Sequence, residues 1–295
     1  MTWLLSIVGV VMIVLALRDI FHTLWHPGGF GILSRLVFAG SWRVARLRLV
    51  ASRAPHLAGP LGLVATLGTW AALVVVGFTL LYLPHMPEGF TFGSSVNQQA
   101  SSDLVESLYL STVALATLGL GDILPATPWL RALVPVEALV GFLLLTAGIS
   151  WILQLYPALN RRRALARRLT TMSRTGAAGV VESGKASIAV QHLEGVRNEL
   201  AGVELDLLQY GESYYFHERD PEISLPAALP CVVELIEAGK RSSALEVRQA
   251  AVMLDDGLSE LLALVRREYL GHRRDVRGRD ETLAAYARDH LQQHL

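Results

Sequence analysis

The feature that most constrains the fold is a run from Leu61 to Leu83 without a single charged residue. A helix needs about 20 apolar residues to cross the hydrocarbon core of a bilayer, so this run predicts a membrane-spanning helix. A second apolar run, from Arg131 to Tyr156, predicts another span. The run from Thr2 to Leu17 is shorter, and the apolar residues that follow it can extend it to a first span. We therefore expect an all-α membrane protein.

Composition adds a soluble part to this expectation. The chain has 295 residues, of which 52% are hydrophobic, and a mean hydropathy of +0.39. These values are high for a soluble protein and low for a chain buried wholly in a membrane, so they predict one part of each kind. The single Cys231 excludes an intrachain disulfide, fits a reducing compartment and is expected to be a small buried residue.

The distribution of arginine orients the spans. Residues 84–102 contain no Lys or Arg, whereas arginines cluster in 35–53 and 161–168. Basic segments stay on the cytoplasmic side, so 84–102 faces outside and both clusters face the cytoplasm. The N-terminal run lacks the basic segment and cleavage site of a secretory signal. We expect a multi-pass protein of the cell (inner) membrane with a cytoplasmic C-terminal domain.

Residues 27–60 are predicted to form a basic amphipathic segment in the cytoplasmic interface; the alternative is that 30–42 forms a further span. Arg18 and Asp19 lie near the same membrane face and can pair. His22 and His26 are four residues apart, but no third ligand is near, so no metal site is predicted there. The candidate contacts for anionic lipid headgroups are Arg43, Arg46, Arg161 and Arg162.

The region between the two main spans contains a short helix and then irregular backbone. Ser102 or Asp103 is a suitable cap for a helix over 103–115, which is too short to cross the membrane. We expect a re-entrant helix whose C-terminal dipole favours a cation near the membrane centre. In the following stretch, 117–122, two glycines alternate with apolar residues. Glycines permit alternating signs of φ, which can turn successive carbonyls toward one axis.

The stretch Thr117-Leu118-Gly119-Leu120-Gly121-Asp122 resembles the selectivity filter of potassium channels, usually Thr-Val-Gly-Tyr-Gly-Asp. The resemblance extends over about 61–156, a third of the chain. It includes Ser111-Thr112-Val113-Ala114 before the filter, Gly121-Asp122-Ile123-Leu124-Pro125-Ala126-Thr127 after it, and Gly141 at the position of the inner-helix hinge. It implies a homotetramer, because one pore loop cannot surround an ion.

By the same resemblance, K⁺ is bound by the backbone carbonyls of Thr117, Leu118, Gly119 and Leu120 and by the Thr117 hydroxyl. Gly121 forms the outer mouth, and no organic cofactor is implied. Leu120 replaces the usual aromatic residue, as in some pore loops of two-pore-domain potassium channels. This departure leaves a weakly selective cation channel as an alternative.

Three further residues are predicted to support the filter. Tyr109 and Leu110 stand where many family members have a pair of tryptophans, and Tyr109 keeps a donor that can reach Asp122. Val113 stands where some bacterial members have an acid, so no carboxyl pair with Asp122 is expected. Glu137 is an intramembrane acid, which is either functional or a hydrogen-bonded structural partner behind the filter; we favour the structural role.

The last span carries a candidate gate. In the register that Gly141 fixes, one helical face presents Phe142, Leu145, Ile149 and Leu153. By resemblance this face lines the cavity, and rings of Ile149 and Leu153 can close it by dewetting. The alternative is that the face packs on lipid or on the outer helix. Leu155 is expected on the opposite face.

The predicted domains are an N-terminal span (1–26), the interfacial segment (27–60), the pore domain (61–156) and a cytoplasmic helical domain (157–295). In the last domain we expect a flexible joint at 176–179, an aromatic core cluster at 214–218 and helices over 186–210, 226–239, 242–270 and 280–294.

Phosphate loops, dinucleotide fingerprints and nucleophile–base sets are missing from the sequence, so neither an enzyme nor a nucleic-acid partner is predicted. The remaining alternative is a membrane-anchored sensor or scaffold with a non-conducting pore.

Overall fold

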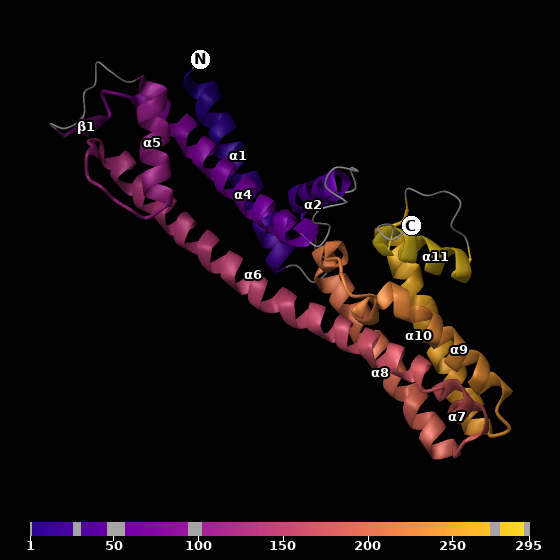
Figure 1. Ribbon diagram of the computed structural model, residues 1–295. Helices are drawn as coiled ribbons and strands as arrows, with labels where there is room; N and C mark the ends of the chain where they lie inside the picture. The colour runs from indigo at the N-terminus through magenta and orange to yellow at the C-terminus, as the bar shows by residue number, and fades with distance from the viewer. Residues whose placement is uncertain (1, 26–30, 46–56, 94–101, 272–277, 292–295) are drawn as a thin grey trace. The chain divides into compact units, whose positions relative to one another are not determined.

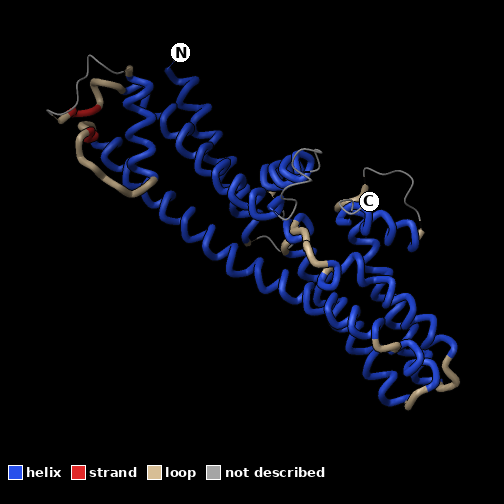
Figure 2. Tube along the Cα trace, in the orientation of Figure 1, coloured by secondary structure: helices blue, strands red, loops and turns tan. Residues whose placement is uncertain are grey.

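A computed structural model describes residues 2–25, 31–45, 57–93, 102–271 and 278–291 (Figure 1). Helices make up nearly all of these residues, and two short strands form the single sheet within them (Figure 2). The chain divides into two compact units. The first comprises 1–38 and 62–153, and the second comprises 39–61 and 154–295. The first unit therefore includes the N-terminal helix together with the predicted pore domain.

Three helices are long and apolar enough to cross a membrane, within the part of the chain that the structure describes. They are α1 (Thr2–Leu24), α4 (Ala58–Tyr82), which continues into the 3₁₀ turn η2 (Leu83–His85), and α6 (Pro128–Arg174). These helices confirm the expected all-α membrane architecture. The short helix α5 (Asp103–Leu115) has the predicted bounds. Ser102 occupies its N-cap position, and Asp103 and Glu106 in the first turn favour its positive dipole end.

Helix α6 is longer than the predicted span. The predicted span ends at Tyr156, ahead of the arginine cluster at 161–168, but the helix continues to Arg174. Charge ends the part of a helix that suits lipid, but it does not end the helix, because arginine is a good helix former. The arginines beyond the span are also paired with acids of the second unit; Arg161, for example, binds Asp206 at 2.5 Å.

A small antiparallel sheet ties the loop after η2 to the end of the stretch 117–122. Strand β1 (Phe90–Phe92) pairs with β2 (Ile123–Pro125), and Phe90 lies opposite Pro125. Next to the sheet, the backbone N–H of Gly93 donates to the carbonyl of Asp122 at 2.7 Å. The backbone that leaves the filter stretch is therefore fixed to the loop that follows η2.

The carboxylate of Asp19 joins three helices of the first unit. It accepts hydrogen bonds from the indole of Trp70 in α4 at 2.9 Å and from the hydroxyl of Ser34 at 2.7 Å. It also accepts the backbone N–H groups of Leu33 and Ser34, at the start of α2 (Ile32–Ala45). Arg18 was the partner expected from sequence. The observed donors hold a carboxylate that is only 5% exposed, and they bring α2 against α1 and α4.

Helix α2 forms part of the predicted interfacial segment, 27–60. Its 14 residues span about 21 Å, which is shorter than a hydrocarbon core, and it is not among the three membrane-spanning candidates. Arg35 and Arg43 lie in this helix. Arg46, Arg48, Arg53 and His26 fall outside the described residues.

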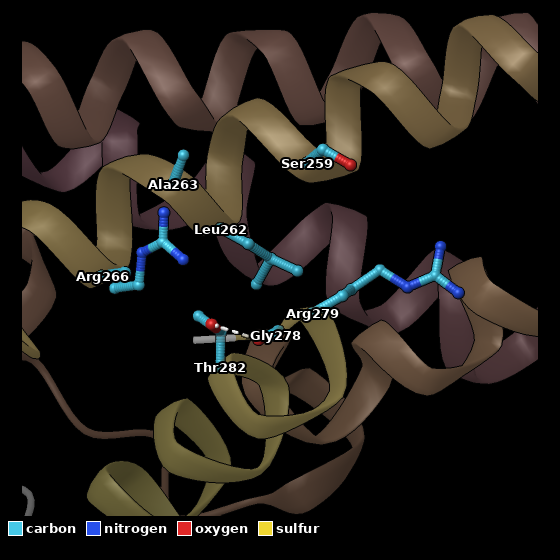
Figure 3. A pocket seen from close by; sticks show the side chains of 7 residues that line it. All are labelled: Ser259, Leu262, Ala263, Arg266, Gly278, Arg279 and Thr282. Carbon is cyan, nitrogen blue, oxygen red and sulfur yellow. Dashed lines mark hydrogen bonds between the residues drawn. The ribbon is translucent and has the colours of Figure 1, made fainter. Parts of the chain in front are cut away.

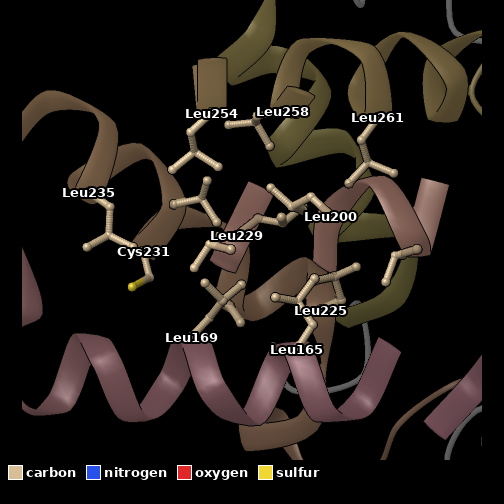
Figure 4. Packing of buried hydrophobic residues seen from close by; sticks show 14 of the residues in the cluster. Leu165, Leu169, Leu200, Leu225, Leu229, Cys231, Leu235, Leu254, Leu258 and Leu261 are labelled. Atoms are coloured by element: carbon tan, nitrogen blue, oxygen red, sulfur yellow. The ribbon is translucent and has the colours of Figure 1, made fainter. Parts of the chain in front are cut away.

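The second unit is a helical bundle. Its elements are the end of α6, α7 (Ala177–Ser183), α8 (Ala186–Gln209), η3 (Gly211–Tyr215), η4 (Pro221–Ile223), α9 (Leu225–Arg241), α10 (Leu245–Glu268) and α11 (Arg279–Leu291). Four of these helices match the predicted ones, with ends that differ by a few residues. The bundle packs around a leucine-rich core to which α6, α8, α9 and α10 contribute, with Cys231 buried in it as expected (Figure 4).

The predicted flexible joint at 176–179 is wrong in part. Gly176 has φ of 68°, which turns the chain, but residues 177–183 form helix α7. Ala177 and Val181 on this helix are buried. Packing against α8 and α9 therefore fixes a stretch whose composition is typical of a linker.

The aromatic cluster after α8 lies in the core, as predicted. Tyr214 is 1% exposed, stacks on Tyr269 with ring centroids 4.0 Å apart and donates to Asp289 at 2.8 Å. Burial raises the pKa of Tyr214 well above its ordinary value, and nearby acidic groups add to the shift. Trp42, from the end of α2, stacks on His217 in the same cluster.

Arg162 contacts this cluster and not a lipid headgroup. Its side chain is buried and donates to the carbonyls of Ser213 at 2.7 Å and Phe216 at 2.8 Å, and it pairs with Glu218. The headgroup prediction for Arg162 is therefore wrong, because a basic run after a span also supplies donors for the domain that follows. Arg161 remains partly exposed beside Asp206.

Candidate functional site

The end of α5 directs the chain into the filter stretch. The helix ends at Leu115, and the next N–H groups bond back into its last turn. The N–H of Thr117 donates to the carbonyl of Ala114 at 2.9 Å, and that of Leu118 donates to Val113 at 3.0 Å. These bonds anchor the first residues of the stretch on the helix end that carries partial negative charge.

The backbone of the stretch has the alternation that the glycines predict. Positive φ angles occur at Thr117 (57°), Gly119 (56°) and Gly121 (79°), that is, at every second residue. Thr117 is the one non-glycine residue with positive φ among those described. L-residues avoid this region because Cβ approaches the following carbonyl oxygen, so its use at Thr117 marks a strained and specific conformation.

The stretch is uncovered in a single chain. Residues 116–121 are exposed, and the side chains of Leu118 and Leu120 are 63% and 62% exposed. Irregular backbone at membrane depth is tolerated only inside protein or beside water, because lipid cannot satisfy its polar groups. In a single chain the stretch is therefore open, and at membrane depth it would need to be covered by further protein or by water.

Asp122 is held behind the stretch by the contact predicted from sequence. The hydroxyl of Tyr109 in α5 donates to Oδ2 of Asp122 at 2.5 Å, while Oδ1 accepts the backbone N–H of Ile123 at 3.1 Å. A hydrogen bond to an ionised group contributes about 1.5–3 kcal/mol. It therefore links the outer end of the stretch to the helix that precedes it.

Glu137 is fully buried and lies among three helices. Its Oε2 accepts the hydroxyl of Tyr82 in α4 at 2.6 Å, and its Oε1 is hydrogen-bonded to the hydroxyl of Ser111 in α5 at 2.5 Å. These contacts agree with the structural interpretation of this acid. The roles of Tyr82 and Ser111 were missed, because no sequence pattern connects them with a glutamate on another helix.

Gly141 allows α6 to touch the end of α5. A Cβ at this position would lie 1.9 Å from the carbonyl oxygen of Leu115. The resemblance assigns Gly141 a hinge role, and the structure adds a steric requirement at the same residue. The sequence did not reveal this requirement, because close approach of two backbones leaves no motif beyond the glycine itself.

The face of α6 that carries the candidate gate is uncovered in a single chain. The four side chains of this face are between 53% and 69% exposed. They are Phe142, Leu145, Ile149 and Leu153. Leu155 lies on another face, as predicted, but is fully buried. It is therefore a poor control position, because a polar residue there would be buried without a partner.

A cavity of about 210 Å³ in the second unit lies between α10 and α11 (Figure 3). The guanidinium groups of Arg266 and Arg279 point in different directions, and Arg279 is paired with Asp255 at 2.5 Å. The cavity therefore lacks converging charges. No cluster of three or more His, Cys, Asp or Glu suited to a metal occurs among the described residues.

A short helix followed by alternating signs of φ, between two helices long enough to cross a membrane, is the arrangement of a pore-loop unit. Residues 67–156, about a third of the chain, match the family model described as ion channel. The segment contains α5, the filter stretch and the candidate gate.

One curated relative has the same membrane character. The chain is 27% identical over 173 residues to the uncharacterized membrane protein YdjJ of Bacillus subtilis (strain 168). The match covers 58% of this chain and 49% of that protein, so this chain spans about half of its relative's length. No solved structure matches the chain.

Replacing Gly141 by Ala should displace the end of α5, because the new Cβ would collide with the Leu115 carbonyl. Overpacking of this kind costs about 1–3 kcal/mol, so thermal unfolding of the purified protein should shift to lower temperature. Gly148→Ala is the control, since its Cβ would meet flexible Leu67 carbons no closer than 3.2 Å. Equal stability of the two variants would contradict the close contact.

Replacing Tyr109 by Phe should loosen the outer end of the filter stretch by removing the bond to Asp122. The loss is about 1.5–3 kcal/mol. We expect ion flux to decay faster or to change in selectivity, measured in liposomes. Tyr156→Phe, which removes a hydroxyl from a half-exposed residue of α6, should leave both properties unchanged. Unaltered flux in both variants would show that Tyr109 does not support the filter stretch.

Proposed function

We propose that the protein is a homotetrameric, potassium-selective channel of the cell membrane. The observation that carries this proposal is the alternation of positive φ at Thr117, Gly119 and Gly121 directly after a re-entrant helix. Rings of backbone carbonyls from such a stretch replace the hydration shell of K⁺. The ligands are the carbonyls of Thr117 to Leu120 and the Thr117 hydroxyl.

The exposure of the site supports four-fold assembly. Leu118, Leu120 and the gate face are apolar and uncovered in one chain. Closed cyclic symmetry places identical loops around one axis, where each chain supplies one side of every ring. In such a ring the two leucines turn from the ion toward the pore helices, as the resemblance implies.

Leu120 favours one competing function, a cation channel with weak selectivity. A leucine has no hydroxyl with which to tie the filter to its surroundings. In this chain the hydrogen bond between Tyr109 and Asp122 fixes the outer end of the stretch instead. We therefore rank potassium selectivity first and weak selectivity second.

The second unit is proposed to be a cytoplasmic regulatory domain. Helix α6 contributes to both units, so it supplies a continuous connection between the candidate gate and the bundle. Anionic headgroups remain proposed partners for Arg43, which is exposed on α2, for Arg46 and for Arg161.

The decisive experiment is a reversal-potential measurement on the purified chain in liposomes with mixed K⁺ and Na⁺. A potassium-selective channel gives a potential close to the potassium equilibrium value. A potential near zero under opposed gradients would establish the weakly selective alternative. Absence of any ion flux would favour the alternative of a membrane-anchored sensor or scaffold with a non-conducting pore.

Gly121→Ala should abolish potassium flux while the protein stays in the membrane. The strain arises from the φ of 79°, since a Cβ at this position has no neighbour within 4 Å. Left-handed backbone costs an L-residue about 1–2 kcal/mol, enough to change a filter conformation. Gly68→Ala, at an exposed helical position that is also free of contacts, should conduct normally. Normal flux in both variants would contradict the assignment of 117–122 as the selectivity filter.

Leu153→Asn should raise basal flux several-fold, because a polar ring at the narrow end of the cavity would hold water. Leu143→Asn is the control, since Leu143 is 60% exposed and lies about 100° around the helix from Phe142. Basal flux is measured without a stimulus in the same liposomes. Equal increases in the two variants would show that the register of the gate is wrong.

A further inference from the structure

Around Glu137, the oxygen atoms that can accept a hydrogen bond outnumber the hydroxyl protons that can be donated to them. The Ser111 hydroxyl lies 2.5 Å from Oε1 of Glu137 and 3.0 Å from the carbonyl oxygen of Val75 in α4. A hydroxyl has one proton to donate and can also accept. If Glu137 were a carboxylate, Ser111 could serve only one of its two neighbours. The Val75 carbonyl also accepts the Thr79 hydroxyl, at 2.7 Å.

The charge environment points the same way. Glu137 is fully buried, and its hydrogen-bond partners, Tyr82 and Ser111, contribute neutral hydroxyls. It forms no ion pair with any residue in the described part of the chain. Burial of an isolated carboxylate is far more costly than burial of a neutral, hydrogen-bonded acid.

We propose that Glu137 carries its proton in the native protein and, as a neutral carboxylic acid, is the positioning residue that fixes the pore helix between the outer and inner helices. The carboxyl O–H then donates to Ser111, Ser111 donates to the Val75 carbonyl, and Tyr82 donates to the other carboxyl oxygen. All three contacts become hydrogen bonds at once. The protonation state stands on geometry alone, whereas the positioning role rests on the proposed conducting pore.

The position of Ser111 gives this arrangement its effect on the filter. Ser111 lies in α5 ahead of the residues whose carbonyls anchor Thr117 and Leu118. Its hydroxyl links α5 both to α6, through Glu137, and to α4, through Val75. The end of α5 also rests against Gly141 of α6. Loss of the Glu137 link would leave α5 free to shift against both neighbours and would move the start of the filter.

The protonation state is tested by infrared spectroscopy of the full chain in lipid at neutral pH. The difference between wild type and Glu137→Gln should contain the carbonyl band of a protonated carboxylic acid. The same substitution at exposed Glu88 should give only carboxylate bands. A carboxylate band at Glu137 would overturn the proposal whether or not the protein conducts.

The positioning role is tested by potassium flux in the same preparations. Glu137→Gln should stay close to wild type, because its amide presents one donor and one acceptor in nearly the same places. Glu137→Ala should reduce flux about ten-fold or more, since it leaves buried hydroxyls without their partner. Ser111→Ala should have a similar effect. Loss of flux in Glu137→Gln, with conduction in wild type, would overturn the positioning role.

Absence of flux in every protein, including wild type, would count against the proposed channel function. In that case the thermal stability of the variants decides the positioning role. Glu137→Gln is then expected to match wild type and Glu137→Ala to unfold at lower temperature. Equal destabilisation of both variants would overturn it.

Discussion

The structure of the first unit depends on one requirement of the membrane, that backbone polar groups must find partners where water is absent. The stretch 117–122 departs from helix between two helices that are long enough to cross a membrane, so this requirement applies to it. Its first N–H groups return to α5, and its last residue is tied by Gly93 and Tyr109. In the proposed channel, the carbonyls between these anchors are the groups that would bind a cation. The physical rule that excludes loops from lipid would then create an ion site where several loops share a water-filled axis.

Two buried acids organise the helices around this stretch. Asp19 has donors from α2 and α4, and two of them are backbone N–H groups at a helix start. Within the described residues, the hydrogen-bond partners of Glu137 are hydroxyls, from α4 and α5. The first arrangement suits a charged carboxylate and the second suits a neutral acid, although the two residues belong to the same unit. Donor type, rather than burial alone, distinguishes them.

Much of this architecture was predictable because membranes impose strong patterns on sequence. Length and apolar composition located the three spans, and the short helix at 103–115 followed from its cap and its length. The alternation of glycines predicted the φ pattern. Contacts between distant side chains were harder: Tyr109 with Asp122 was expected only through a family resemblance. The bonds of Asp19 to Trp70 and of Glu137 to Ser111 leave no periodic signal. Arg162 was misassigned, because a basic run that follows a span has the same composition whether it meets lipid or a protein core.

The contact between Gly141 and the Leu115 carbonyl has a mechanical consequence. If α6 bends at Gly141, the pivot lies at the point where that helix supports the pore helix. A helix that bends at this contact moves widely at its far end and hardly at all beside the contact. The part of α6 after Gly141 can then move outward while the backbone of 117–122 stays in place. A change at this contact, even one added methyl group, would displace the filter stretch before it affected the candidate gate.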